Sequence, residues 1–327
     1  MVKLIKDNYK FIIIIIVIIL IFWLPIPYYI DAPGGLTNLN KKISIGTKKI
    51  NGSYNMTYVS EYKASIPLVI YSWFNKNYDI YKKDDILLEN ESDKEYNKRD
   101  SLFLKESLSN AVICAYNLAN REVIKENNYL YVGYILEDSN TDLVVGDSII
   151  SIDGTKVNTK EDVNNVLRNK KIGKKISIAV ANNKKQYQRF AYVKEENNRH
   201  IIGIIPIEVF DYKTNPKIKI KTSASESGSS GGLMLSLSIY DLLTKIDLAH
   251  GRVIAGTGTI DEYGNVGEIG GIKYKIKGAL RSKVDVFFVP SENYKEALKV
   301  VKKNKYKINI VKVDKISDAI NYLKKTR

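Results

Sequence analysis

The chain has 327 residues, of which 44% are hydrophobic and 27% are charged, and its formal net charge is +15. This composition is typical of folded domains and excludes a largely disordered chain. The lysines are spread along the chain without a nucleic-acid-binding motif, so we expect no nucleic-acid partner and a lysine-rich surface close to anionic lipid. Because Cys114 is the only cysteine, intramolecular disulfides are excluded.

The N-terminal part of the chain contains a long apolar segment, "FIIIIIVIILIFWLPIPYYI", from Phe11 to Ile30. It carries no charge and has the length of about 20 residues that a helix needs to cross a bilayer. No small-residue cleavage site follows it, so we predict an uncleaved transmembrane anchor at 11–30. Lysines precede the anchor, which predicts a cytoplasmic N-terminus at 1–10 and a single-pass protein of the cell membrane with extracellular C-terminal domains.

The segment after the anchor, 32–127, begins with short stretches of β-type alternation. We predict strands within 32–75 and a polar surface loop at 76–100. Apolar residues then recur at helical spacing from Leu104 to Ala119, which predicts a helix with one buried face.

From about residue 130 the sequence changes to a pattern typical of strand, strand, helix and strand, which indicates a separate unit at 128–196. Its "VGDSIISIDGTKV", followed by a helical stretch, resembles a PDZ domain. PDZ domains bind peptides as an added strand, and the resemblance places this strand site at Tyr131, Val132, Gly133 and Tyr134. No glycine precedes that strand, so capture of a free C-terminus stays open, and a PDZ-shaped spacer that binds nothing is the alternative.

The stretch "GSSGG" runs directly into the apolar sequence "LMLSLSIYDLL", which predicts a helix. Its serines therefore lie at a helix N-terminus, where free N–H groups can stabilise an oxyanion. A serine N-cap without any catalytic role is the alternative. Neither His200 nor His250 lies in a recognisable Ser-His-Asp context, so a base for a serine nucleophile must come from elsewhere.

A lysine-rich stretch, "GEIGGIKYKIKGAL", offers this base. If 272–280 is helical, Lys273 and Lys277 share one face and Lys275 lies roughly opposite, with small or apolar neighbours along the helix. A lysine shielded in this way would have a lowered pKa and could accept a proton. Three solvated lysines on a basic helix are the alternative.

Three motifs together resemble Lon proteases. "GSSGG" resembles their G-P-S-A-G nucleophile loop, "TGTIDEYGNVGEIGGIKYK" resembles the stretch that carries their lysine, and "LFLKESLSNAVICAY" resembles their M-K-E-S-x-x-x-A helix. With the anchor and the PDZ-like unit, the chain is similar to the membrane-anchored, PDZ-containing, Lon-like serine proteases of bacteria.

The resemblance assigns roles to individual residues. It implies that Ser230 is the nucleophile, that Lys275 is the general base and that Thr257 helps to hold the lysine. The loop that supplies the oxyanion donors would comprise Gly228, Ser229, Gly231 and Gly232. Two positions depart from the family pattern, because Ser229 replaces a proline and Gly231 replaces the usual alanine, and Ser229 is thus a rival nucleophile.

The resemblance also implies a fold and a reaction. The fold class is an α/β (α+β) Lon-type proteolytic domain, split into 32–127 and 197–327 by the inserted PDZ domain. The chain has no phosphate-binding loop and no metal-ligand motif, so we expect an ATP-independent serine endopeptidase without metal or cofactor. It would cleave peptides or unfolded protein segments outside the cytoplasm, with the PDZ domain assisting recruitment. A homo-oligomer is compatible with the sequence, which does not determine the oligomeric state.

Two other functions remain open at this stage. One is a catalytically inactive PDZ scaffold at the membrane, which would be free to lose either Ser230 or Lys275. The other is an anchored Ser-Lys signal peptidase, a family that places its serine soon after the anchor rather than behind a PDZ domain.

Overall fold

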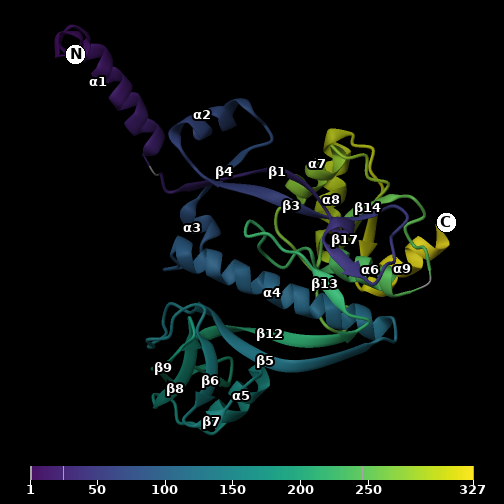
Figure 1. Cartoon of the computed structure of the whole chain (residues 1–327). Coiled ribbons are helices and arrows are strands. Elements are labelled where there is room, and N and C mark those ends of the chain that lie inside the picture. Colours follow the sequence, from purple (N-terminus) through teal and green to yellow (C-terminus); the bar gives the residue numbers. More distant parts are fainter. Residues whose placement is uncertain (1, 25, 245, 327) are drawn as a thin grey trace.

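The computed structural model describes residues 2–24, 26–244 and 246–326, without the side chains of residues 2–7 and of Trp23. The predicted N-terminal segment and anchor therefore include Met1 and Pro25, which lie outside the described residues. Within these ranges the helices are α1 (Val2–Trp23), α2 (Ile66–Phe74), α3 (Lys83–Ile86), α4 (Asp93–Leu118), α5 (Lys160–Arg168), α6 (Gly232–Leu243), α7 (Ile272–Leu280), α8 (Ser291–Asn304) and α9 (Ile316–Lys325), with a short 3₁₀ helix at Leu39–Lys41 (Figure 1).

The strands belong to two larger sheets and several short pairs. They are β1 (Tyr28–Asn38), β2 (Ile43–Ile45), β3 (Ser53–Lys63), β4 (Asp79–Lys82), β5 (Glu122–Ile135), β6 (Ser148–Ile152), β7 (Thr155–Lys156), β8 (Lys175–Asn182), β9 (Lys185–Tyr192), β10 (Lys194–Glu196), β11 (Arg199–Ile201), β12 (Ile204–Asn215), β13 (Ile218–Ile220), β14 (Val253–Gly256), β15 (Thr259–Ile260), β16 (Val266–Gly267), β17 (Val286–Pro290) and β18 (Ile310–Val313). The described chain is thus of mixed α/β type.

The first large sheet combines strands from both ends of the sequence. Its order is β18-β17-β14-β3-β1-β4, and β14 pairs in parallel with β3 and with β17. Strands β1, β3 and β4 precede the PDZ-like segment, whereas β14, β17 and β18 follow it. The two distant parts of the chain therefore form one folded body.

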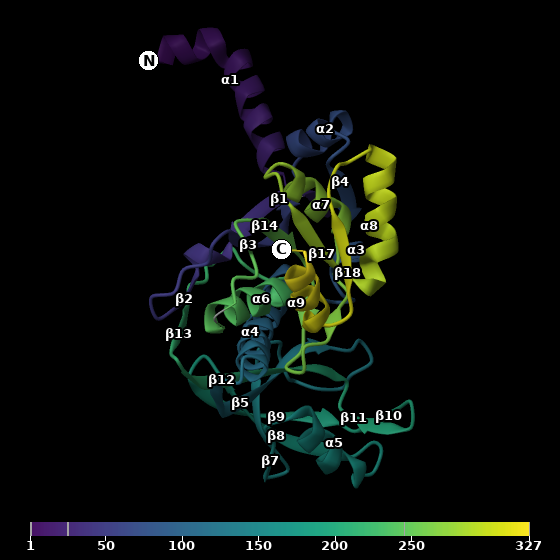
Figure 2. The same ribbon diagram turned by 90° about the vertical axis from the view of Figure 1, so that its right-hand side faces the viewer.

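Helices cover both faces of this sheet (Figure 2). Val286 and Phe288 of β17 pack in a core with α4, α6 and α9. Phe287 and Val289 of the same strand pack on the other face with α7 and α8. A strand that is buried on both faces reads as a continuous apolar run, and "VFFVP" is such a run.

Helix α4 begins earlier than the helical spacing from Leu104 indicates. Ser92 and Glu95 form a reciprocal capping box, which starts the helix at Asp93. The predicted loop at 76–100 is therefore wrong in part, because it also contains β4 and α3. The helices predicted at "LMLSLSIYDLL" and at 272–280 are confirmed as α6 and α7.

The predicted anchor at 11–30 is too long at its C-terminal end. Helix α1 ends at Trp23, and Tyr28–Ile30 begin β1, where all three pair with β4 and Tyr29 and Ile30 also pair with β3. Proline has no N–H group for a helical bond, so a stretch with two prolines ends the helix before the sheet begins. Within the part of the chain that is described, no helix combines the length and the apolar character that a membrane crossing requires.

The second large sheet has the order β12-β5-β6-β8-β9 and packs with α5 around a core of its own. It extends past both predicted limits of the PDZ-like unit at 128 and 196. Strand β5 begins at Glu122, and β12 pairs with β5 from Ile204 to Asn215. The long β5–β12 ribbon lies against α4, which connects this sheet to the first body (Figure 1).

The peptide-binding strand predicted at Tyr131, Val132, Gly133 and Tyr134 is corrected, because Tyr131 and Val132 are paired on both sides and β12 lies along the strand as far as Tyr134. On one side, Tyr131 and Val132 face Ile207 and Pro206 of β12. On the other side, Tyr131 pairs with Ser148 of β6, and Val132 N–H donates to the Asp147 carbonyl. The sequence pattern identified a strand correctly but did not show that β12 would occupy its neighbouring position.

One buried contact joins the two halves of the first body and gives a test of their union. The Tyr54 hydroxyl of β3 donates to Asp241 Oδ2 of α6 at 2.8 Å, in the buried core. We expect Tyr54→Phe to lower the free energy of unfolding by about 1–3 kcal/mol, because the buried carboxylate loses a donor. Urea denaturation measures this change. The exposed Tyr62→Phe serves as control, and an equal, negligible effect of both substitutions would contradict the account.

Candidate active site

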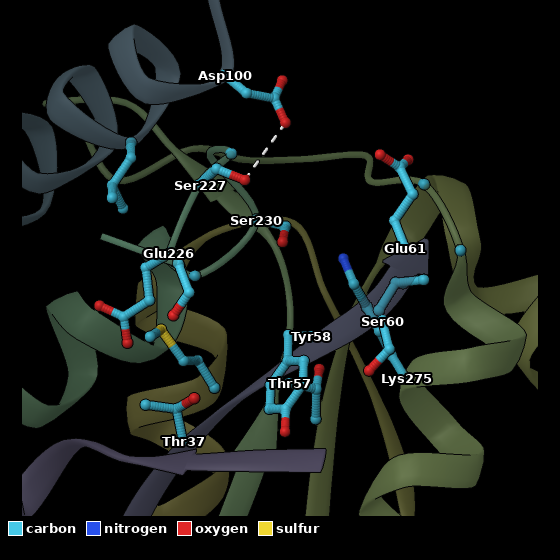
Figure 3. A pocket seen from close by; sticks show the side chains of 18 of the residues that line it. Thr37, Thr57, Tyr58, Ser60, Glu61, Asp100, Glu226, Ser227, Ser230 and Lys275 are labelled. Carbon is cyan, nitrogen blue, oxygen red and sulfur yellow. Dashed lines mark hydrogen bonds between the residues drawn. The ribbon is translucent and has the colours of Figure 1, made fainter. Parts of the chain in front are cut away.

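The site is a cleft of 1460 Å³ that opens between the two halves of the first body. Its walls come from β1 and β3, from the N-terminal half of α4, from the loop before α6 and from the start of α7 (Figure 3). Ser230, Gly231 and Lys275 all line it. The candidate nucleophile and base thus face one common space, although 45 positions separate them in the sequence.

The serine loop before α6 is fixed by hydrogen bonds on several sides. Gly228 N–H donates to the Asp100 carbonyl at 3.0 Å, and the Ser107 hydroxyl donates to the Ser229 carbonyl at 3.0 Å. From the other side, Gly258 N–H donates to the Ser230 carbonyl at 2.8 Å. A loop held by both α4 and the β14–β15 connection is a shaped structure and not a flexible linker.

Two positions of the loop require glycine, one because of its backbone conformation and one because of close packing. Gly228 has φ +77°, a left-handed conformation in which a side chain is strained. At Gly232, a Cβ would lie 2.6 Å from Ile260 Cγ2 and 2.9 Å from Ser107 Oγ. The first turn of α6 therefore packs closely against α4 and β15, which fixes the position of Ser230.

Lys275 lies on α7 with its side chain buried, and only 4% of the residue is exposed. Burial lowers its pKa from 10.5 to about 7, and no charged group in the described part of the chain offsets this effect. At neutral pH a large fraction of these amines is uncharged. The amine can therefore accept a proton.

The neighbouring Lys273 has a different environment. Its amine forms an ion pair with Asp79 at 2.9 Å. Burial is the largest single influence and lowers the pKa of Lys273, but the hydrogen bond to Asp79 and the interactions with Tyr81 and with the charge of Asp79 together raise it overall. The same helix thus presents one lysine as a cation and another as a potential base, because Lys273 is less buried and has Asp79 and Tyr81 beside it, whereas Lys275 is buried without such partners among the described residues.

Thr257 links the lysine to the serine loop. Lys275 Nζ donates to Thr257 Oγ1 at 3.2 Å, and Thr257 Oγ1 donates to the Ser230 carbonyl at 3.1 Å. The hydrogen bond of the lysine goes to Thr257 and not to the Ser230 hydroxyl, while its amine points toward the loop that carries Ser230 (Figure 3). The arrangement holds a nucleophile and a base on the same side of the cleft.

Sequence reasoning gave no individual role to two α4 residues that position this loop. Ser107 is the first of the two serines in the quoted "LFLKESLSNAVICAY", and it contacts the loop directly. Asp100 accepts from Gly228 N–H through its carbonyl, and its carboxylate accepts a weak hydrogen bond from Ser227 at 3.5 Å (Figure 3). Burial raises the pKa of the Asp100 carboxyl. The motif resemblance was a signal for Ser107, whereas nothing in the local sequence indicated Asp100.

Other residues considered from sequence lie away from the cleft. The β5 residues Tyr131–Tyr134 belong to the second sheet and do not line it. The ring of His200 contacts the Leu167 carbonyl, and His250 lies beside Asp247. Across the described residues, no group of three or more His, Cys, Asp or Glu side chains could hold a metal ion.

Comparisons with known proteins identify a family for more than half of the chain, and the matched range begins within the PDZ-like unit. Residues 143–325 match the family described as the Lon protease (S16) C-terminal proteolytic domain. The chain is 33% identical over 96 residues to the Lon protease of Aster yellows witches'-broom phytoplasma, which covers 29% of this chain and 12% of that protein. It is 30% identical over 100 residues to the Lon protease of Neorickettsia sennetsu, covering 31% of this chain and 12% of that protein.

These alignments span about one eighth of the length of either relative. Among solved structures, the PDZ domain of an SdrC-like protein from Listeria monocytogenes is 23% identical to this chain, with a TM-score of 0.21. That similarity covers 24% of this chain and 85% of the PDZ domain.

The environment of Lys275 predicts a pH dependence of stability. Between pH 7 and 10.5 the unfolded chain binds a proton at this lysine that the folded chain does not bind. The free energy of unfolding therefore rises with pH in this window, by up to about 1.4 kcal/mol per pH unit relative to a variant without the amine. Denaturant titrations of Ser230→Ala with and without Lys275→Met measure the difference, and parallel pH profiles of the two proteins would contradict the assigned burial.

Proposed function

The chain belongs to the Lon protease (S16) proteolytic domain family, whose members are serine-type peptidases, and we propose that it is an endopeptidase with a Ser230–Lys275 dyad. The observation that carries this proposal is the buried amine of Lys275, which faces the Ser230 loop and is joined to it through Thr257. An uncharged amine beside a serine at a helix N-terminus suits nucleophilic catalysis.

The proposed reaction is hydrolysis through an acyl-enzyme. Neutral Lys275 takes the proton of the Ser230 hydroxyl while Ser230 Oγ attacks the scissile carbonyl. The resulting Lys275 ammonium then returns the proton to the leaving amine. Water then attacks the ester, with Lys275 again acting as base. The backbone N–H groups of Ser230 and Gly231 donate to no acceptor in the described part of the chain and lie at the start of α6. We assign them as the oxyanion donors.

Strand β3 supplies a binding edge for an extended substrate. It pairs with β14 from Ser53 to Met56, whereas its pairing with β1 continues to Lys63. Past Met56 the edge on the β14 side has no strand partner in the described structure, and this part of β3 lines the cleft. A peptide in extended form can pair with this edge, so the substrates are peptides and flexible or unfolded protein segments.

We propose that the cleavage itself requires no ATP, because the steps assigned to Ser230 and Lys275 use no nucleotide. We assign the second sheet, 122–215, as a PDZ-type unit that assists recruitment. Since β5 is an interior strand, strand addition would use the outer edge of β12, where Lys160 N–H at the start of α5 donates to Glu208. We further propose that α1 attaches the protein to the cell membrane, with the folded part outside the cytoplasm.

A test of the dyad compares cleavage of fluorescently labelled, unfolded casein without nucleotide. Removing one member of a catalytic unit typically lowers kcat by about 10⁴-fold or more. We therefore expect such a loss in Ser230→Ala and in Lys275→Ala, while Ser229→Ala keeps most of the activity. Circular dichroism serves to check that each variant is folded. Unchanged cleavage in both dyad variants would favour the inactive scaffold, and complete loss in Ser229→Ala alone would exchange the roles of the two serines.

The link through Thr257 gives a second kinetic prediction. Thr257→Val keeps the shape of the side chain but removes the hydroxyl that accepts from Lys275 and donates to the Ser230 carbonyl. We expect kcat to fall about 100-fold, as when a catalytic group is slightly misplaced, with KM little changed. Thr257→Ser restores the hydroxyl and should recover most of the rate. An equal loss in both variants would show that Thr257 acts through packing alone.

A further inference from the structure

Helix α2 is a short apolar helix on the outside of the molecule. Its sequence, "IPLVIYSWF", lies within the range predicted to form strands, but a proline in the first turn and the following residues form a helix. Trp73 is 70% exposed and Phe74 is 85% exposed, and Ile70 and Tyr71 are exposed as well. An exposed cluster of this size on a folded domain marks an interaction surface.

The exposed face of α2 continues the apolar surface of α1. The two helices are in contact, and both views show α2 beside the C-terminal end of α1 (Figures 1 and 2). From Phe11 to Phe22 the side chains of α1 are also largely exposed apolar groups. Two apolar helices that meet at one place share the same surroundings, so whatever covers α1 there also borders α2.

The chemistry of α2 favours the polar–apolar boundary of a bilayer as this surrounding. It contains Tyr71 and Trp73, the aromatic residue types that concentrate at the level of lipid headgroups. With its nine residues it is far shorter than the roughly 20 that cross a bilayer, so any contact of α2 with a bilayer is at the interface. Lys76, two residues after the end of α2, is exposed, which suits anionic headgroups.

We propose that α2 inserts its exposed aromatic face into the headgroup region of the membrane to which α1 attaches the protein. This inference rests on the proposed membrane attachment but not on catalysis. Because α2 connects β3 to β4, and β3 forms a wall of the cleft, the contact holds the cleft close to the bilayer surface. The substrates reached there are segments of chain near the membrane, such as the extracytoplasmic ends of anchored proteins.

The chain allows a direct test because it contains two tryptophans, Trp23 and Trp73. In the full-length protein with Trp23→Phe and Ser230→Ala, Trp73 is the only tryptophan, and the proposed nucleophile has been removed to prevent proteolysis. The protein is placed in vesicles of phosphatidylcholine and phosphatidylglycerol that contain brominated lipids. We expect a blue-shifted Trp73 emission that bromine close to the headgroup quenches more than bromine near the chain ends. Emission typical of water, without quenching, would overturn the proposal.

Two comparisons exclude other occupants of this face. A second protein copy on α2 would shift the emission to the blue without bromine quenching, and only at a high protein-to-lipid ratio, which would also overturn the proposal. Adding Phe74→Ser should weaken the quenching, whereas Tyr187→Ser, an exposed aromatic of β9, should leave it unchanged. None of these measurements uses peptidase activity. The proposal for α2 can therefore be wrong while the proposed Ser230–Lys275 dyad is correct, and the dyad can be wrong while the proposal for α2 is correct.

Discussion

An amine held in the protein interior without a carboxylate is the constraint on which the account of this molecule depends. Lys275 lies on α7 with its charge opposed by burial, and its hydrogen bond goes to the hydroxyl of Thr257. Lys273 on the same helix shows the alternative, in which Asp79 supports the charge. Because burial makes the charged form of Lys275 unfavourable in free energy, this lysine can accept a proton near neutral pH.

The surrounding fold brings the amine of Lys275 and the hydroxyl of Ser230 to the same cleft. Strands from before and after the second sheet share one sheet, so β3 and β14 lie side by side. Helix α4, from the earlier part, holds the serine loop through Asp100 and Ser107. The later part supplies Ser230, in the loop before α6, and Lys275, on α7. Neither half contains a complete site, and the insertion of the second sheet leaves their contact intact.

Sequence patterns predicted local features better than pairings between distant segments. The shielded face of Lys275 followed from its helical neighbours, because helix periodicity is a local property. The strand at Tyr131–Tyr134 was found, but its neighbour β12 comes from more than 70 positions later, and alternation says nothing about which edge stays free. Helix α2 was read as extended because its β-branched and aromatic residues are those that favour strands.

The most direct test of this constraint is the protonation of Lys275 itself. Lysines labelled with ¹³C at Cε, in a chain carrying Ser230→Ala, give one resonance per lysine, and the signal missing in an additional Lys275→Arg variant identifies the residue. Its chemical shift should titrate with a midpoint near the pKa of about 7 that burial produces. A midpoint at 10.5, the value of an ordinary solvated lysine, would contradict the proposed role of this amine as a base.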